Sequence, residues 1–239
     1  MLHCRRDLPC RGGHRVFHGR GATYIRSNTG QTDQNFGGTN PLILGTSQNS
    51  SVYRVLLNFD LSTIPAGATI DSVTLSMTGT TGESASFDAP AGLRILQLTT
   101  GFSEGDGVSS NGIGPANGHA SWDNAGPSQP WADPGGDFST IPLATITKNP
   151  RNLLAAWNFT STAAFPTAVE SSIGDIFSLM LRLDSEELSQ RRIFFLNSDE
   201  AASNRPTLSV TYSIPEPTVI CLGGVAVLPL LIRRGKAVV

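Results

Sequence analysis

Two tryptophans lie close together in a polar, proline-rich stretch of the chain. Trp122 and Trp131 belong to the segment SWDNAGPSQPW, next to Asp123 and Asn124. Sugar rings have apolar faces that stack on indole rings, while their hydroxyl groups bind carboxylates and amides. We therefore expect these four residues to contact a carbohydrate ligand. The alternative is that one or both indole rings fold back and cap the domain.

Acidic residues crowd the glycine-rich region 101–140, namely Glu104, Asp106, Asp123, Asp133 and Asp137. Calcium takes oxygen ligands from flexible loops, so a structural calcium site is one interpretation of this group. A pair of carboxylates at a set separation, as glycosidases use, is a second interpretation. Solvated loop acids without a ligand are the third. Apart from calcium, no cofactor is expected.

A nucleophile with its base is not recognisable in the sequence. His119 is the one histidine after residue 18, and no serine or cysteine stands in a nucleophile motif. A catalytic triad needs a hydroxyl group and a carboxylate beside the imidazole. The sequence does not support such a triad, and we expect a non-catalytic protein.

The first 21 residues form a basic leader with five Arg and one Asp. Cys4, Cys10, His14 and His18 are of the right types for metal ligands, but their spacing matches no zinc pattern and no packed scaffold is expected around them. The leader also lacks the apolar run of a secretory signal. We expect residues 1–21 to be disordered or to result from a mis-assigned start codon.

Alternating apolar and polar residues predict strands with one buried face. The alternation is clearest in 73–78, 177–183 and 208–212. More continuous apolar runs at 55–61 and 93–98 predict central strands that are covered on both faces. Turn residues separate these runs. The patterns together predict an all-β fold, a jelly-roll-like antiparallel β-sandwich.

We place this domain at residues 22–213. One segment inside it, 150–159, has Leu153, Leu154 and Trp157 at helical spacing, so a short helix is expected there, with Trp157 in the core. The domain contains no cysteine, which excludes a disulfide framework.

Charge is distributed unevenly along the chain. Residues 22–213 hold nine Lys and Arg against 17 Asp and Glu, a net charge of −8. Nucleic-acid affinity rests largely on Lys and Arg that displace counterions from phosphates. An acidic domain is therefore not expected to bind nucleic acid.

Residues 214–239 have the composition of a membrane-sorting tail. Pro215, Glu216 and Pro217 precede the apolar run 218–232, which Arg233 and Arg234 follow. A helix over this run would be about 22 Å long, short of the roughly 30 Å apolar thickness of a bilayer. We expect a short hydrophobic helix that anchors the chain transiently in the inner membrane with its basic end in the cytoplasm. The alternative is a hydrophobic hairpin buried in the domain.

This tail resembles the PEP-CTERM sorting signal of exopolysaccharide-producing Gram-negative bacteria. The resemblance implies export, recognition by an exosortase-type sorting enzyme, removal of the tail near Pro-Glu-Pro and delivery to the cell surface or extracellular matrix. The chain runs past the Arg pair through residues 235–239, which departs from the usual ending and bears on the efficiency of cleavage.

The domain resembles the disaggregatase-related (DNRLRE) β-sandwich repeat of surface proteins. The matching motifs are Tyr24-Ile25-Arg26, Asn35-Phe36-Gly37, residues 54–61 with Ile64-Pro65, and Ser198-Asp199-Glu200 with Arg205-Pro206-Thr207-Leu208. The resemblance implies a jelly-roll-like sandwich and, in some members, carbohydrate binding.

Two arginines in these motifs are candidates for structural ties. We expect Arg54 and Arg205 to pair with Asp60, Asp199 or Glu200 across the sheet, because an arginine at such a position more often holds the fold than a ligand.

Three functions remain. The expected one is a carbohydrate-binding or matrix-associated surface module, with exopolysaccharide as its partner. The alternatives are a structural protein of the cell surface or biofilm without a ligand site, and a polysaccharide-active enzyme.

Overall fold

The computed structural model describes residues 11–47, 49–80, 90–107, 119–148, 156–187 and 191–215. Its strands are β1 (Arg11–His18), β2 (Gly21–Arg26), β3 (Leu42–Thr46), β4 (Val52–Asp60), β5 (Thr69–Thr78), β6 (Ala91–Gln97), β7 (Asn124–Gly126), β8 (Gln129–Pro130), β9 (Ala144–Lys148), β10 (Ala156–Asn158), β11 (Thr160–Ser161), β12 (Ile176–Leu183), β13 (Arg191–Phe195) and β14 (Thr207–Ile214). The helix α1 (Ala164–Glu170) lies between β11 and β12. The expected all-β fold is confirmed.

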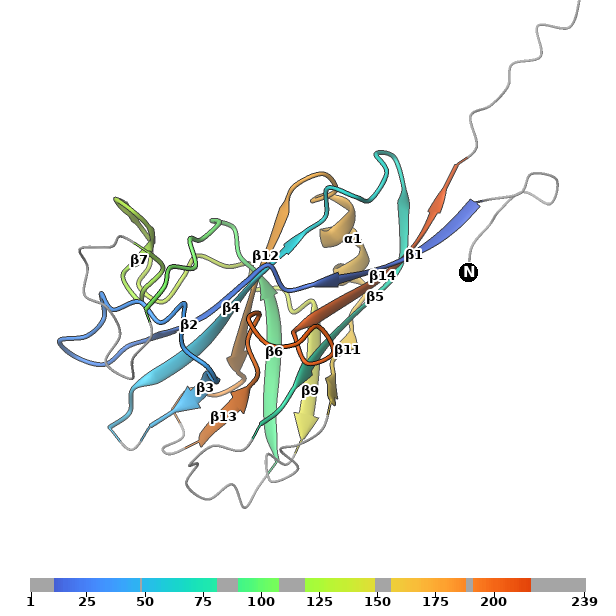
Figure 1. Cartoon of the computed structure of the whole chain (residues 1–239). Coiled ribbons are helices and arrows are strands. Elements are labelled where there is room, and N and C mark those ends of the chain that lie inside the picture. Colours follow the sequence, from blue (N-terminus) through green and yellow to red (C-terminus); the bar gives the residue numbers. More distant parts are fainter. Residues whose placement is uncertain are drawn as a thin grey trace, which may run out of the picture.

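Two antiparallel sheets pack against each other (Figure 1). The first has the strand order β1-β14-β5-β10, and the second has the order β11-β9-β6-β12-β4-β3-β13 with β2 also paired to β4. The strands β7 and β8 form a separate two-stranded hairpin. The expected antiparallel sandwich is therefore confirmed.

The alternating residues build the core between the two sheets, as predicted. Val73, Leu75 and Met77 of β5 are buried, and Leu208, Val210 and Tyr212 of β14 are buried beside them. They belong to one apolar cluster with residues of β4, β6 and β12 from the facing sheet. The intervening polar residues of β5 and β14 are exposed or half-buried, as the two-residue period of a strand requires.

The second sheet is covered on both faces, which confirms the interpretation of the continuous apolar runs. Leu56 of β4 and Met180 of β12 belong to a second buried cluster, separate from the main core. The other members of that cluster are Ile25, Leu98, Ala120, Ala125 and Trp131. Segments of the region 98–140 thus form a third layer over the outer face of this sheet.

The domain begins earlier than expected. Residues 11–18 belong to the leader that was expected to be disordered or to result from a mis-assigned start codon. They are ordered as β1, which pairs with β14 from Arg11 opposite Ile214 to His18 opposite Thr207. Glycines and charged residues obscured this strand, because Phe17 is its one buried apolar side chain. A Cβ on Gly13 would lie 2.4 Å from Cζ of Tyr212, so the tyrosine ring packs directly against the glycine.

The four candidate metal ligands of the leader are not brought together by the described residues. His14 and His18 are exposed on β1 and lie four residues apart. This spacing corresponds to about 13 Å along a strand, which is too far for one metal ion. Cys4 and Cys10 lie outside the described residues.

The predicted helix over 150–159 is wrong in the part that the structure describes. Residues 156–158 form β10, paired with β5, and 149–155 lie outside the described residues. Trp157 is fully buried, as predicted, and its ring meets Phe195 edge-on with 5.3 Å between the ring centroids. Trp157 and Phe159 are both buried while Asn158 is exposed. Residues 157–159 therefore follow the two-residue period of a strand, and not the helical period predicted from Leu153, Leu154 and Trp157.

The predicted C-terminal hydrophobic helix falls within residues 216–239, outside the described residues. Among the residues that the structure describes, no helix has the length and apolar character needed to cross a bilayer.

Candidate functional site

Trp131 is part of the third layer and has almost no surface left for a ligand. Its side chain is 5% exposed and packs in the second buried cluster. The indole Nε1 donates a hydrogen bond of 2.9 Å to the carbonyl oxygen of Ser121. This burial contradicts the predicted ligand contact at Trp131 and agrees with the alternative that this indole folds back onto the sheet.

The other three predicted contacts lie around the start of the β7–β8 hairpin. Trp122 is half-buried, and its ring faces the guanidinium group of Arg54 at 4.8 Å. The backbone of Asp123 bonds to Thr32 and Trp131. Asn124 bonds to Ser121 through its backbone N–H and, at 3.4 Å, through its amide group. These contacts shape the hairpin, and a sugar contact at Trp122, Asp123 or Asn124 stays a prediction.

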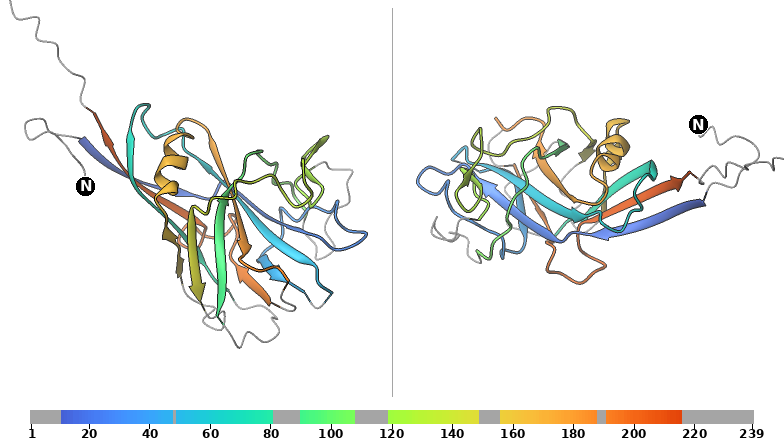
Figure 2. Two further views of the ribbon diagram at one scale, coloured as in Figure 1. Left: turned by 180° about the vertical axis from the view of Figure 1, so that it is seen from behind. Right: turned by 90° about the horizontal axis from the view of Figure 1, so that it is seen from above.

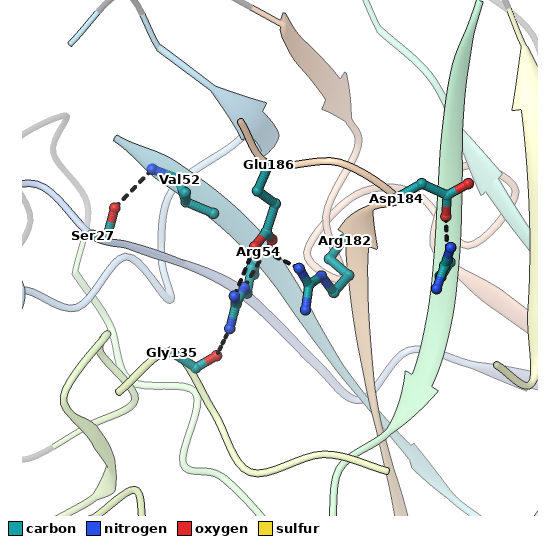
Figure 3. A network of polar contacts seen from close by, with 8 residues as sticks. Ser27, Val52, Arg54, Gly135, Arg182, Asp184 and Glu186 are labelled. Carbon is teal, nitrogen blue, oxygen red and sulfur yellow. Dashed lines mark hydrogen bonds and ion pairs between the residues drawn. The ribbon is translucent and has the colours of Figure 1, made fainter. Parts of the chain in front are cut away.

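Arg54 is the centre of a polar cluster on the outer face of the second sheet (Figure 3). Its Nε and Nη2 donate hydrogen bonds of 2.9 and 2.8 Å to the two carboxylate oxygens of Glu186. Arg182 donates to the same carboxylate at 2.7 Å. The side chains of Arg54 and Glu186 are only 11% and 12% exposed, so this bidentate pair is shielded from water.

Two aromatic rings complete this cluster. The Cζ atoms of Arg54 and Arg182 both lie 5.5 Å from the centroid of Phe138, and Arg54 also stacks on Trp122. The Nη1 of Arg54 donates a hydrogen bond of 2.8 Å to the carbonyl oxygen of Gly135. Gly135 has a φ of +99°, and a Cβ there would lie 2.6 Å from that Nη1, which explains a glycine at this position. We call Arg54, Arg182, Glu186, Phe138 and Trp122 the arginine cluster.

Burial lowers the pKa of Arg182, and the nearby Arg54 and Arg94 lower it further, while Glu186 acts in the opposite direction. The guanidinium groups of Arg54 and Arg182 share the carboxylate of Glu186. Arg94 forms a second and more exposed pair with Asp184, at 2.5 Å.

The predicted partners of Arg54 were wrong. The arginine pairs with Glu186, 132 residues away, and not with Asp60, Asp199 or Glu200. Asp60 pairs with Arg20 instead, at 2.5 Å and on the surface. Glu186 belongs to no motif that the sequence analysis singled out, and a pairing across this distance has no local signature.

Arg205 and Glu200 do meet, but not as an ion pair. The Nε of Arg205 donates to the backbone carbonyl oxygen of Glu200 at 2.5 Å. The Glu200 carboxylate accepts from the amide of Asn40, and the Asp199 carboxylate accepts from the amide of Asn197. These contacts are local ones within 197–205 and with Asn40, so the predicted pairing of Arg205 with a carboxylate across the sheet is not observed.

An open cleft of about 670 Å³ lies beside the arginine cluster. Arg54 and Phe138 form part of its wall, and Thr99, Thr100, Thr140 and Asp133 add polar groups. A smaller hollow of about 160 Å³ shares Phe138 and Thr140 with it and reaches Arg94, Arg182 and Asp184. The cleft combines an aromatic ring, hydroxyl groups, a carboxylate and a guanidinium group, which is a set that suits a polyhydroxylated ligand.

No protein-family model and no curated protein matches this chain. The DNRLRE and PEP-CTERM resemblances therefore stay predictions, which are carried by the motifs quoted above.

The five loop acids do not form one metal site. Among the described residues, no three His, Cys, Asp or Glu side chains are gathered closely enough to hold an ion. Asp137 holds its own loop, because it accepts hydrogen bonds from the backbone of Ala132 and Asp133 and from the hydroxyl of Thr100. Asp133 is exposed in the cleft, and its carboxylate contacts no other described side chain. Of the two loop acids that line the cleft, Asp133 is thus the one whose carboxylate is not already bonded to its own loop.

Asn35 fastens residues 104–107 and Ala120 to the sandwich. Its side chain is 2% exposed and makes four hydrogen bonds. The amide nitrogen donates to the carbonyl oxygens of Glu104 and Ala120, and the amide oxygen accepts from the N–H groups of Gly37 and Gly107. A buried amide with all these bonds made fixes the loop position.

Glu104 lies at the same junction, away from the cleft. Its carboxylate accepts hydrogen bonds from the backbone N–H of Ala22 at 2.6 Å and from the hydroxyl of Ser198 at 3.2 Å. Burial raises the pKa of Glu104, and Asp199 adds to the rise, although the two hydrogen bonds oppose it. The folded protein therefore keeps a proton on Glu104 to a higher pH than the unfolded chain does.

We expect Glu104→Gln to change how stability depends on pH. In the wild type, the free energy of unfolding should fall as the pH rises from the ordinary glutamate pKa through the raised pKa of the folded state. Glutamine cannot ionise but still accepts both hydrogen bonds. The variant should therefore lose this fall and be at least as stable as the wild type at neutral pH. Urea denaturation at several pH values measures both effects.

The matched variant is Glu104→Ala, which removes the acceptor and should be less stable than Glu104→Gln at every pH. An unchanged pH dependence in Glu104→Gln would show that another group causes it.

Ser103 and His119 form a contact that the sequence analysis missed. The Ser103 hydroxyl lies 2.9 Å from Nδ1 of His119. A catalytic pair also needs a group that orients the imidazole, and no described carboxylate bonds to the other nitrogen of His119. Within the part of the chain that the structure describes, this contact ties two loop segments together and does not amount to a triad.

Proposed function

We propose that this chain is an exported, non-catalytic β-sandwich that binds polysaccharide in the cleft beside the arginine cluster. The supporting observation is the cleft itself, whose Phe138 and Arg54 are fixed by the contacts with Glu186, Arg182 and Gly135. A site built on rigid elements loses little conformational entropy when a ligand binds.

The chemistry of the wall fits sugars. Phe138 lines the cleft and is proposed to contact the apolar side of a pyranose, while the threonine hydroxyls and Asp133 are proposed to bind its hydroxyl groups. A volume of about 670 Å³ is within the usual range for ligand pockets, roughly 300 to 1,000 Å³. The proposed ligand-binding region is therefore the cleft. Trp122 contributes by stacking on Arg54, and Trp131 contributes through its packing in the second buried cluster.

Delivery is the second part of the proposal. The tail at 215–234 is proposed to be read by an exosortase-type sorting enzyme, with transient anchoring of residues 218–232 in the inner membrane and release to the cell surface or extracellular matrix. The partners are then the sorting enzyme and an exopolysaccharide. The net negative charge of the domain is unfavourable for binding nucleic acid.

Asp133→Ala tests the binding part. Affinity electrophoresis against neutral and acidic polysaccharides should show retardation of the wild type by at least one of them. Loss of a charge-assisted hydrogen bond should weaken that binding about tenfold. Asp123→Ala is the comparison variant. Asp123 does not line the cleft and its described contacts are made by the backbone, so the cleft proposal predicts unchanged binding, whereas the sugar contact predicted at Asp123 requires a loss.

If the two variants bind polysaccharide equally weakly, the binding site does not lie in the cleft. No retardation by any polysaccharide would favour the structural alternative, and release of reducing ends would favour the enzyme.

A further inference from the structure

The start of β1 and the end of β14 lie side by side at one edge of the molecule. β1 pairs with β14 over its whole length, and Arg11 lies opposite Ile214. The paired strands form a ribbon that reaches this edge of the molecule, where β5 also pairs with β14 as far as Ser213 opposite Thr69 (Figures 1 and 2). We call residues 11–13 with 212–215 the ribbon tip. The β7–β8 hairpin lies at the opposite end of the molecule in the views of both figures.

A short stretch of chain connects the ribbon tip to the apolar run of the tail. Three Cα steps lead from Pro215 to Thr218, where the run begins. Three residues reach at most about 11 Å, and the headgroup layer on each side of a bilayer is roughly 5 to 8 Å thick. When the run is inserted, Pro215 therefore cannot lie far above the headgroups.

The charge distribution also favours this end of the molecule. β1 contains two Arg, two His and no acid, and β14 contains no charged residue. Within the part of the chain that the structure describes, the carboxylate that bonds to the ribbon is that of Asp71, which accepts from the hydroxyl of Ser213 at 3.4 Å. Residues 22–213 together have a net charge of −8. Anionic lipid headgroups repel such an acidic body but not the ribbon.

We propose that the ribbon tip rests on the headgroups of an anionic lipid bilayer while the tail is inserted, and that the β7–β8 end points away from it. This inference rests on the sorting part of the proposed function. It adds a defined contact surface, the ribbon tip, and a defined orientation for the molecule at the stage when the tail is recognised.

Fluorophores at the two ends of the molecule test the orientation. A polarity-sensitive label is attached to Gly12→Cys at the ribbon tip or to Gln129→Cys on β8, in full-length chains in which Cys4, Cys10 and Cys221 are serine. Both positions are exposed, and a Cβ on Gly12 would have its nearest neighbour at 3.9 Å. Each protein is mixed with phosphatidylglycerol and phosphatidylethanolamine vesicles and separated by flotation.

We expect both proteins to float with the vesicles, a blue shift of the label at position 12 and no shift at position 129. Thermal melting should match that of the unlabelled chain and so confirm folding. Flotation with a shift at 129, or without one at 12, would overturn this inference and leave the sorting proposal intact. Failure to float would refute membrane insertion of the tail, and both proposals would fall together.

Discussion

Replacing Arg54 with methionine is expected to lower the free energy of unfolding by about 3 kcal/mol, because removing one partner of a buried ion pair leaves the other charge uncompensated. Glu186 would keep Arg182 as a partner but would lose its bidentate contact with Arg54. Gly135 would lose a hydrogen bond, and Trp122 and Phe138 would lose a stacking guanidinium group. Chemical denaturation followed by tryptophan fluorescence measures the change.

Arg94→Met is the matched control for this prediction. Arg94 also lies on the second sheet and pairs with an acid, Asp184, but the two side chains are 46% and 41% exposed. Exposed pairs of this kind contribute less than about 1 kcal/mol. Equal losses in Arg54→Met and Arg94→Met would mean that burial of the arginine cluster does not matter.

Asn35→Ala is expected to be similarly damaging, with a loss of about 4 kcal/mol, since it leaves two carbonyl oxygens and two N–H groups of a buried junction without their partner. The chain around residues 104–107 and Ala120 should also become more open to proteolysis, because the amide fastens these residues to the sandwich. Denaturation and limited digestion with a nonspecific protease measure the two effects.

Asn124→Ala is the control for this substitution. The amide of Asn124 makes one contact of 3.4 Å and is half-buried, so its loss should cost less than about 1 kcal/mol. A stable and protease-resistant Asn35→Ala protein would contradict the role given to this amide.

The sandwich was predictable because its strongest signal is local. Val73, Leu75 and Met77 alternate with hydroxyl-bearing residues, and such a pattern can bury one face only as a strand. β1 was missed because Gly13 supplies no apolar side chain where the ring of Tyr212 fills the space. Its assignment depends on β14, almost 200 residues later in the chain, and not on its own sequence.

The candidate site was predictable in its region but not in its members. The aromatic and acidic residues of 101–140 were singled out, and Asp133 does line the cleft. The prediction for Trp131 was wrong because a polar, proline-rich sequence does not reveal that its ring is buried in one apolar cluster with Leu56 and Met180. The Arg54–Glu186 pair joins two strands through tertiary packing, so neither partner can be recognised from its neighbours in sequence.

The central claim is that the cleft beside Arg54 binds polysaccharide without cleaving it. The most direct test is isothermal titration of the wild-type protein with the exopolysaccharide of its own host, with Asp133→Ala in parallel and an assay for reducing ends after the titration. We predict saturable binding by the wild type, about tenfold weaker binding by the variant, and no new reducing ends. Absence of binding, equal binding by the two proteins, or release of reducing ends would contradict the claim.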